Sequence, residues 1–200
     1  MIARIVNPDY NLDLELPGFD SMSDDEFFNF CAQNKNIKIE RDANYQIYIM
    51  PPAGIESAGK NSELTTEITL WNRKNKLGKT GDSSSGFFLP DKSMKSPDVA
   101  WISNEKWESI PLNDREKFPY IAPEFIIELM SPSDRLKAAQ SKMSKWIENG
   151  VLLGWLINPK TETSIIYRAD SSVEIIIGFD KKLSGEDVLP GFELDLSILK

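Results

Sequence analysis

Apolar residues recur along the chain at the spacing of an α-helix in two long segments. In the first segment, residues 55–77, the apolar residues that share one helical face are Leu64, Ile68 and Trp71. Gly78 is expected to end this helix. The second helix is expected to start from a cap at Ser133 or Asp134 and to end at Asn149-Gly150. Its apolar stripe consists of Leu136, Ala139, Met143, Trp146 and Ile147.

Shorter patterns predict one more helix and a set of strands. Ser23 and Glu26 have the spacing of a capping box, so a short helix should begin there. Apolar runs bounded by turn residues predict strands at 37–40, 45–50, 83–89, 98–102, 125–129, 152–157, 163–167 and 173–177. The first two strands are separated by a turn at Asp42-Ala43-Asn44. This order of elements predicts an α/β (α+β) fold with a central mixed β-sheet flanked by helices.

Length and composition favour one folded domain. The chain has 200 residues, of which 40% are hydrophobic and 10% aromatic, which is enough to fill a core. We expect a single domain over residues 1–200, with residues 1–22 as an N-terminal extension. No apolar run is long enough for a signal peptide or a membrane span, so a cytoplasmic protein is expected.

The absence of some residue types limits the chemistry. Cys31 is the single cysteine, which excludes a disulfide framework and a cysteine-rich zinc site. The chain has no histidine, which excludes a Ser-His-Asp triad and histidine-based acid–base catalysis. Oxygen atoms are then the ligands that remain for a metal, and they favour Mg²⁺ or Mn²⁺ over zinc. The net charge of −8 argues against a protein that coats nucleic acid, but a local cationic groove is compatible with it.

Two acidic residues stand next to strongly apolar segments. Asp98 follows Pro97 at the start of an expected strand, and Glu128 lies inside the nearly continuous apolar run 125–129. Each has an ordinary explanation, because an aspartate after proline is often a turn residue and a glutamate in such a strand is often paired at an edge. If neighbouring strands bring the two carboxylates together, a hard cation would relieve their mutual repulsion.

Lys142 is the third candidate for the site. At 3.6 residues per turn it falls on the flank of the apolar stripe beside Trp146, whereas Lys145 falls on the far side. A lysine on that flank can reach inward toward a strand, although it can equally extend to solvent.

Four segments in order resemble a known family. They are SPDVAW (96–101), FP–APEFIIELMSPSDRL (118–136), KM–WIENGVLLGWLINP (142–159) and VLPGFELDL (188–196). Together they resemble a large bacterial family of proposed restriction endonucleases, related to PD-(D/E)XK nucleases and formerly described as a domain of unknown function. The resemblance runs from about Ser23 to the C-terminus. It implies a restriction-endonuclease-like fold in which Asp98 is the motif aspartate and Glu128 the second acid.

The resemblance also implies roles for other residues. The lysine of the superfamily usually follows the second acid by two residues, where this chain has Met130. In this family the lysine is moved to the following helix, and Lys142 stands at that place. Glu40 and Asn61 match two further family positions, the second often a histidine in relatives. Glu40 could instead be a charge at a strand end, and Asn61 could bond locally.

The implied activity is metal-dependent hydrolysis of nucleic-acid phosphodiesters, with DNA as the expected substrate and a homodimer as the expected assembly. Asp98, Glu128 and the backbone carbonyl of Leu129 would bind Mg²⁺ or Mn²⁺. Phosphate contacts could come from Arg135, Lys137, Lys145 and the cationic run Arg73-Lys74-Lys76-Lys79. The alternative is a catalytically inactive binding or regulatory protein on a nuclease scaffold, which Met130 and the acidic composition favour.

Overall fold

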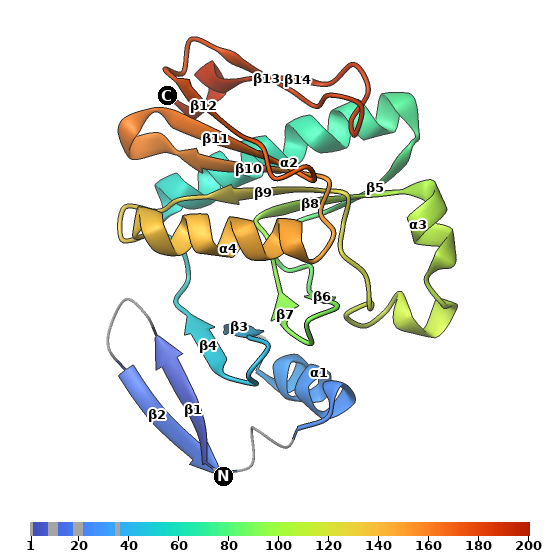
Figure 1. The fold of residues 1–200 in the computed structure, drawn as a ribbon, viewed down its shortest axis with the longest axis vertical. Coiled ribbons are helices and arrows are strands. Elements are labelled where there is room, and N and C mark those ends of the chain that lie inside the picture. The colour runs from blue at the N-terminus through green and yellow to red at the C-terminus, as the bar shows by residue number, and fades with distance from the viewer. Residues whose placement is uncertain (1, 8–11, 18–21, 35–36) are drawn as a thin grey trace. The chain divides into compact units, whose positions relative to one another are not determined.

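The computed structural model describes the backbone of residues 2–7 and 12–17, and both backbone and side chains of residues 22–34 and 37–200 (Figure 1). The chain forms two compact units. Unit 1 comprises Met1–Pro52, Gly86–Ser96 and Ile110–Ile121, and unit 2 comprises Ala53–Ser85, Pro97–Ser109 and Ala122–Lys200. A single domain over residues 1–200 stays a prediction, and part of the expected extension 1–22 lies outside the described residues.

Unit 1 is built on a six-stranded sheet. In spatial order its strands are β2 (Leu12–Pro17), β1 (Ile2–Asn7), β4 (Ile47–Met50), β3 (Lys38–Arg41), β7 (Met94–Lys95) and β6 (Phe87–Phe88). β3 and β4 form the antiparallel hairpin that the sequence predicted around the turn at Asp42. Helix α1 (Asp24–Gln33) begins with the predicted capping box, in which the Ser23 hydroxyl accepts the N–H of Glu26. A short 3₁₀ helix, η2 (Leu112–Asp114), also belongs to this unit.

The core of unit 1 contains a buried arginine. Arg41 is fully buried, and its guanidinium lies over the rings of Phe27 and Tyr45 at 4.9 and 4.7 Å. It is also ion-paired with Asp24 at the start of α1. Charge pairing and cation–π contacts together offset the cost of removing a guanidinium from water. Arg41 therefore links the β3–β4 hairpin to α1.

Unit 2 contains a second six-stranded sheet. Its strands, in spatial order, are β12 (Val173–Ile177), β11 (Thr163–Arg168), β10 (Leu153–Asn158), β9 (Phe125–Leu129), β8 (Val99–Ser103) and β5 (Gly78–Gly81). β9 and β10 are parallel and the other neighbours antiparallel, so the sheet is mixed, as the sequence predicted. The remaining elements are α2 (Ile55–Asn75), α3 (Asn104–Ser109), α4 (Leu136–Glu148), η3 (Pro159–Thr161), η4 (Leu196–Leu199) and the hairpin β13 (Lys182–Ser184) and β14 (Glu193–Asp195).

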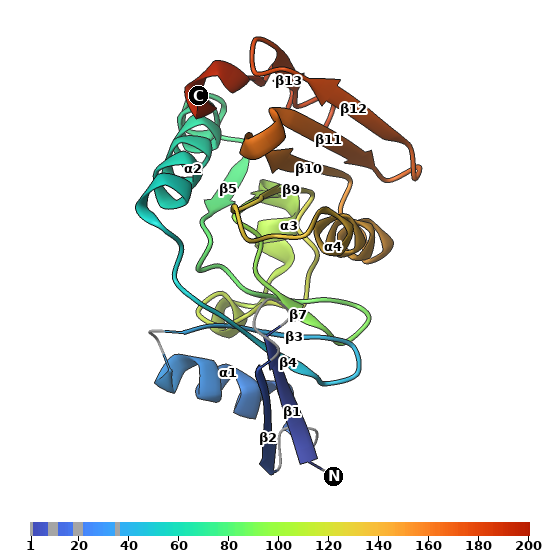
Figure 2. The same ribbon diagram turned by 90° about the vertical axis from the view of Figure 1, so that its left-hand side faces the viewer.

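The two long helices cover opposite faces of this sheet (Figure 2). On one face Leu64 and Ile68 of α2 pack in a buried cluster with Trp155 and the C-terminal segment. On the other face α4 approaches so closely that a Cβ at Gly154 would lie 2.6 Å from Met143 Cε. Residues of one strand alternate between these faces, which we call the α2 face and the α4 face.

Three local predictions were wrong. α2 ends with Lys76 in the left-handed conformation, while Gly78 begins β5. A strand over 83–89 does not form: Ser84 and Ser85 bond to Asp82 in a turn, and β6 covers Phe87–Phe88 alone. α4 has Arg135 at its N-cap without a side-chain bond, because the Asp134 carboxylate accepts the N–H of Ser131 instead. No helix in the described part of the chain is long and apolar enough to cross a membrane.

Candidate active site

Asp98 and Glu128 come from neighbouring strands of the unit 2 sheet. Glu128 is in β9, and Asp98 immediately precedes β8, which pairs with β9. The N–H of Asp98 donates to the carbonyl of Ile127 at 3.0 Å, and the Asp98 carboxylate accepts the N–H of Leu129 at 2.8 Å. Asp98 therefore bonds to the residues on both sides of Glu128, which brings the two acidic positions close together.

Glu128 is held by two side chains of α4. The indole N–H of Trp146 donates to Glu128 Oε1 at 2.8 Å. The ammonium of Lys142 lies 2.9 Å from Oε1 and 3.1 Å from Oε2. The Glu128 side chain is 11% exposed, so its charge needs these partners to offset the loss of hydration. Glu128 thus points to the α4 face with a fixed orientation.

The helical phase of α4 separates its two central lysines as the sequence predicted. The Lys142 side chain is 23% exposed and reaches inward to Glu128. The Lys145 side chain is 57% exposed and pairs with Glu148 at 2.7 Å on the surface. Lys142 can therefore act at the carboxylate, whereas Lys145 is turned away from it.

The residues that follow Glu128 are tied to the neighbouring strands. The N–H of Leu129 bonds to Asp98, as described above. Met130 is 7% exposed and donates its N–H to the carbonyl of Ile157 at 2.8 Å. Its thioether carries no charge, so an ammonium near Glu128 has to come from elsewhere, and Lys142 supplies it.

Asn61 lies on the inward stripe of α2, one turn before Leu64. Its amide oxygen is buried and has no hydrogen-bond partner among the described residues. Because α2 covers the α2 face and Glu128 points to the α4 face, the fold does not bring Asn61 to the same face as Glu128. A part for Asn61 in catalysis stays a prediction.

Glu40 belongs to β3 of unit 1. It is 4% exposed, accepts the N–H of Ser96 at 3.1 Å and lies 3.3 Å from the ammonium of Lys95. It is therefore a buried, paired carboxylate rather than a charge at an exposed strand end. Whether it contributes to catalysis stays a prediction.

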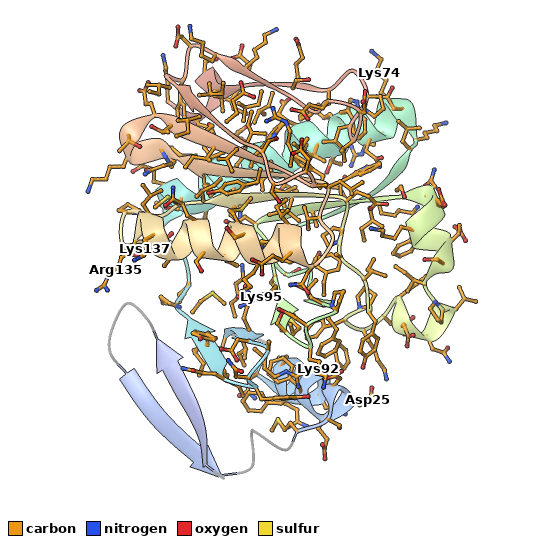
Figure 3. All side chains as sticks on the ribbon, viewed as in Figure 1. Asp25, Lys74, Lys92, Lys95, Arg135 and Lys137 are labelled. Carbon is orange, nitrogen blue, oxygen red and sulfur yellow. The ribbon has the colours of Figure 1, made fainter. Side chains whose placement is uncertain are left out.

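The cationic residues that the sequence suggested as phosphate contacts lie at α4, around the end of α2 and in β5. Arg135 and Lys137 are exposed at the start of α4, and Lys74 lies near the end of α2 (Figure 3). Arg73 and Lys74 occupy the last turn of α2, where positive charge is favoured by the helix dipole. Lys79 lies 5.7 Å from the ring of Trp107, which gives it a structural contact. Lys137 shares α4 with Lys142, and Arg135 is the N-cap residue of that helix.

Comparison with known proteins identifies the family. The model of the Uma2 family, described as "Putative restriction endonuclease", matches residues 24–197. The chain belongs to the Uma2 family. Its fold is similar to the crystal structure of "a putative nuclease belonging to DUF820 from Anabaena variabilis ATCC 29413", with a TM-score of 0.68 and 19% identity over 80% of this chain and 88% of that one. No curated protein matches the chain.

The donors of the candidate site suit a hard cation with few protein ligands. Among the described residues, no three cysteine, aspartate or glutamate side chains converge into a cluster that could hold a metal. Mg²⁺ is commonly bound by one or two carboxylates and completed by water and phosphate oxygens. Asp98 and Glu128 fit that pattern, because two carboxylates leave the remaining coordination positions to water and phosphate oxygens.

One residue of the candidate site was not predicted from the sequence. Trp146 was assigned to the apolar stripe of α4, and it is indeed 1% exposed. Its indole N–H, however, donates a hydrogen bond to Glu128. A buried tryptophan needs a partner for that N–H, so a carboxylate predicted on the facing strand was the available signal.

Proposed function

We propose that this chain is a metal-dependent endonuclease that hydrolyses phosphodiester bonds, with DNA as substrate, as a cytoplasmic homodimer. The observation that carries the proposal is the arrangement of Asp98 beside β9, Glu128 within it and Lys142 at the Glu128 carboxylate. Membership of the Uma2 family supports the reaction class. In this proposal the whole chain is one nuclease-like domain.

Asp98 and Glu128 are the proposed ligands of Mg²⁺ or Mn²⁺, with the backbone carbonyl of Leu129 as a third. Continuing the strand alternation one residue before β8 directs Asp98 to the α4 face, because Val99 belongs to the buried cluster on the α2 face. Both carboxylates would then serve one cation. When bound, the cation supplies Lewis-acid polarisation of the phosphate and a water of lowered pKa.

Lys142 and Trp146 have different proposed parts. Trp146 positions Glu128 through its N–H and does not touch the substrate. Lys142 carries the charge that would orient the attacking water or stabilise the negative charge that develops on the phosphate. Attack at phosphorus would leave a 5′-phosphate and a 3′-hydroxyl, with the proton of the water passing to solvent.

Affinity for nucleic acid is proposed to come from the start of α4. Arg135 and Lys137 are exposed there, on the helix that carries Lys142. Contacts of lysine and arginine with phosphate release counterions, so binding should weaken steeply as salt is raised. The acidic net charge of the chain makes a local patch of this kind necessary.

Plasmid nicking in Mg²⁺ or Mn²⁺ tests the proposal, with the wild type compared with Asp98→Ala and Glu128→Gln. Glu124→Gln is a matched control, because the Glu124 side chain is also 11% exposed and also lies near a lysine, Lys106 at 3.7 Å. We expect nicking by the wild type and by the Glu124 variant, and its loss in the other two. Equal nicking by the wild type and Asp98→Ala would remove the assignment.

Met130 favours a second candidate, a nuclease-like protein that binds or regulates without cleaving. The usual lysine position is then filled by a buried thioether, and Lys142 serves solely as the partner of Glu128. Calorimetric titration with Mn²⁺ separates the two candidates. Saturable binding that Asp98→Ala removes supports the endonuclease, and a degenerate site would give no heat of binding.

A further inference from the structure

Strand β12 presents an unusual edge. It is the outermost strand of the unit 2 sheet (Figure 2) and, among the described strands, it pairs with β11 alone. Val173, Ile175 and Ile177 alternate along it and are 54%, 59% and 73% exposed. Ile176 between them packs against the buried cluster of the α2 face. The three exposed residues therefore form an apolar row on the α4 face, which we call the β12 row.

The opposite edge of the same sheet is protected in the usual way. β5 is four residues long and carries Lys79, and a short edge strand with a lysine discourages pairing with another chain. β12 has no lysine, proline or glycine in its sequence VEIII. A free edge of this composition is typical of a strand that pairs with a further strand.

The side chains of β12 can face those of a second β12 without opposing like charges. In an antiparallel pair centred on Ile175, Ile175 faces its own copy and Val173 faces Ile177 of the other chain. Glu174 then faces Ile176, so no two like charges are opposed. The carboxylate of Glu174 is already paired with Arg168 of its own chain at 2.6 Å. The strand thus offers a self-complementary apolar row without an unpaired charge.

We propose that two copies of this chain associate through β12, pairing antiparallel about a two-fold axis at Ile175 to form one continuous sheet. A two-fold axis that relates antiparallel neighbours in one sheet is perpendicular to that sheet. The α4 faces of both copies therefore lie on the same side. The next consequence rests on the proposed function: both candidate sites would contact one DNA duplex from the same side of the joined sheet.

The test is the molecular mass in solution, measured by light scattering over a dilution series without metal or nucleic acid. The wild type is expected to approach twice the 22.7 kDa of the chain as concentration rises. Ile175→Lys and Ile175→Glu should each be monomeric, because like charges would then meet on the axis. Mixing the two variants should restore a dimer, since lysine would face glutamate. Leu112→Lys is the control, because Leu112 is 75% exposed outside β12.

Each outcome is decisive. A wild type that stays monomeric at every concentration, or a dimer that persists in Ile175→Lys, would overturn the proposal. Failure of the mixed variants to associate would reject the pairing at Ile175. Circular dichroism shows that each variant is folded, and substitution at a largely exposed side chain should leave the fold intact. Because no cleavage is measured, the dimer and the nuclease activity can fail independently.

Discussion

Trp146 and Trp155 allow the hydrogen bond to Glu128 to be measured by difference. Both side chains are buried, at 1% and 0% exposure. The indole N–H of Trp146 bonds to Glu128 at 2.8 Å, whereas that of Trp155 has no partner among the described residues. Changing either residue to phenylalanine keeps an aromatic ring and removes similar volume, so the two cavity costs are comparable.

The difference between the two variants should therefore isolate the bond to the carboxylate. A hydrogen bond to a charged group contributes about 1.5 to 3 kcal/mol, and Lys142 stays in place to offset part of the loss. Trp146→Phe should lower the free energy of unfolding by about 2 kcal/mol more than Trp155→Phe. Urea unfolding followed by circular dichroism measures both values. Equal destabilisation, or a larger effect of Trp155→Phe, would show that the bond to Glu128 does not stabilise the fold.

Metal binding gives the same pair of variants a second measurement. If Trp146 positions a ligating carboxylate, its replacement should weaken Mn²⁺ binding by about 10- to 100-fold, as for other groups that orient metal ligands. Trp155→Phe should leave the dissociation constant unchanged. If Trp146 had a structural part alone, its replacement would lower the free energy of unfolding and leave the affinity for Mn²⁺ unchanged.

Three further predictions concern stability, reactivity and nucleic-acid binding. Gly59 is in an open position within α2, so Gly59→Ala should raise the free energy of unfolding by about 0.5–1 kcal/mol. Gly78→Ala should lower it by about 1–3 kcal/mol, because the new Cβ would lie 2.0 Å from a backbone carbonyl of β8. Urea unfolding that ranks the two variants in the opposite order would contradict this prediction. Burial raises the pKa of the Cys31 thiol to about 12, so little reactive thiolate exists at pH 8. Alkylation of Cys31, followed by mass spectrometry, should therefore be slow until the protein unfolds. Rapid labelling of the native protein would be inconsistent with that burial. In a fluorescence-anisotropy titration, Lys137→Ala should weaken DNA binding and reduce the salt dependence of the affinity, whereas Lys74→Ala should change neither. Equal effects of the two substitutions would reject the start of α4 as the DNA-binding surface.

The sequence predicted most of the elements that carry the candidate site. β9 has the bounds expected from its continuous apolar run, and α4 ends where Asn149-Gly150 indicated. The phase of α4 directed Lys142 inward because a 3.6-residue period fixes which side chains flank a stripe. These features follow from local patterns, so one sequence was enough to find them.

Features that depend on long-range contacts were not predicted. The position of Gly78 in β5 follows from its pairing with Ser103 of β8, which is distant in the sequence. The hairpin β13–β14 is short and its strands are eight residues apart, so neither strand gave a clear period. By contrast, the alternation in Leu12–Pro17 was available in the sequence, and β2 could have been expected from it.

The bond between Trp146 and Glu128 shows a further limit. Position in an apolar stripe indicates burial, but it does not indicate where the indole N–H points. That direction depends on the rotamer and on the facing strand. The partners of buried polar atoms therefore had to come from the structure.

Anomalous scattering from a crystal of the protein soaked in Mn²⁺ would show whether Asp98 and Glu128 hold one metal ion. We expect one strong peak about 2–2.3 Å from carboxylate oxygens of both Asp98 and Glu128, with the Leu129 carbonyl as a further ligand. A fully soaked crystal with no peak there, or with the two carboxylates directed to opposite faces of the sheet, would show that Asp98 and Glu128 do not share a metal ion.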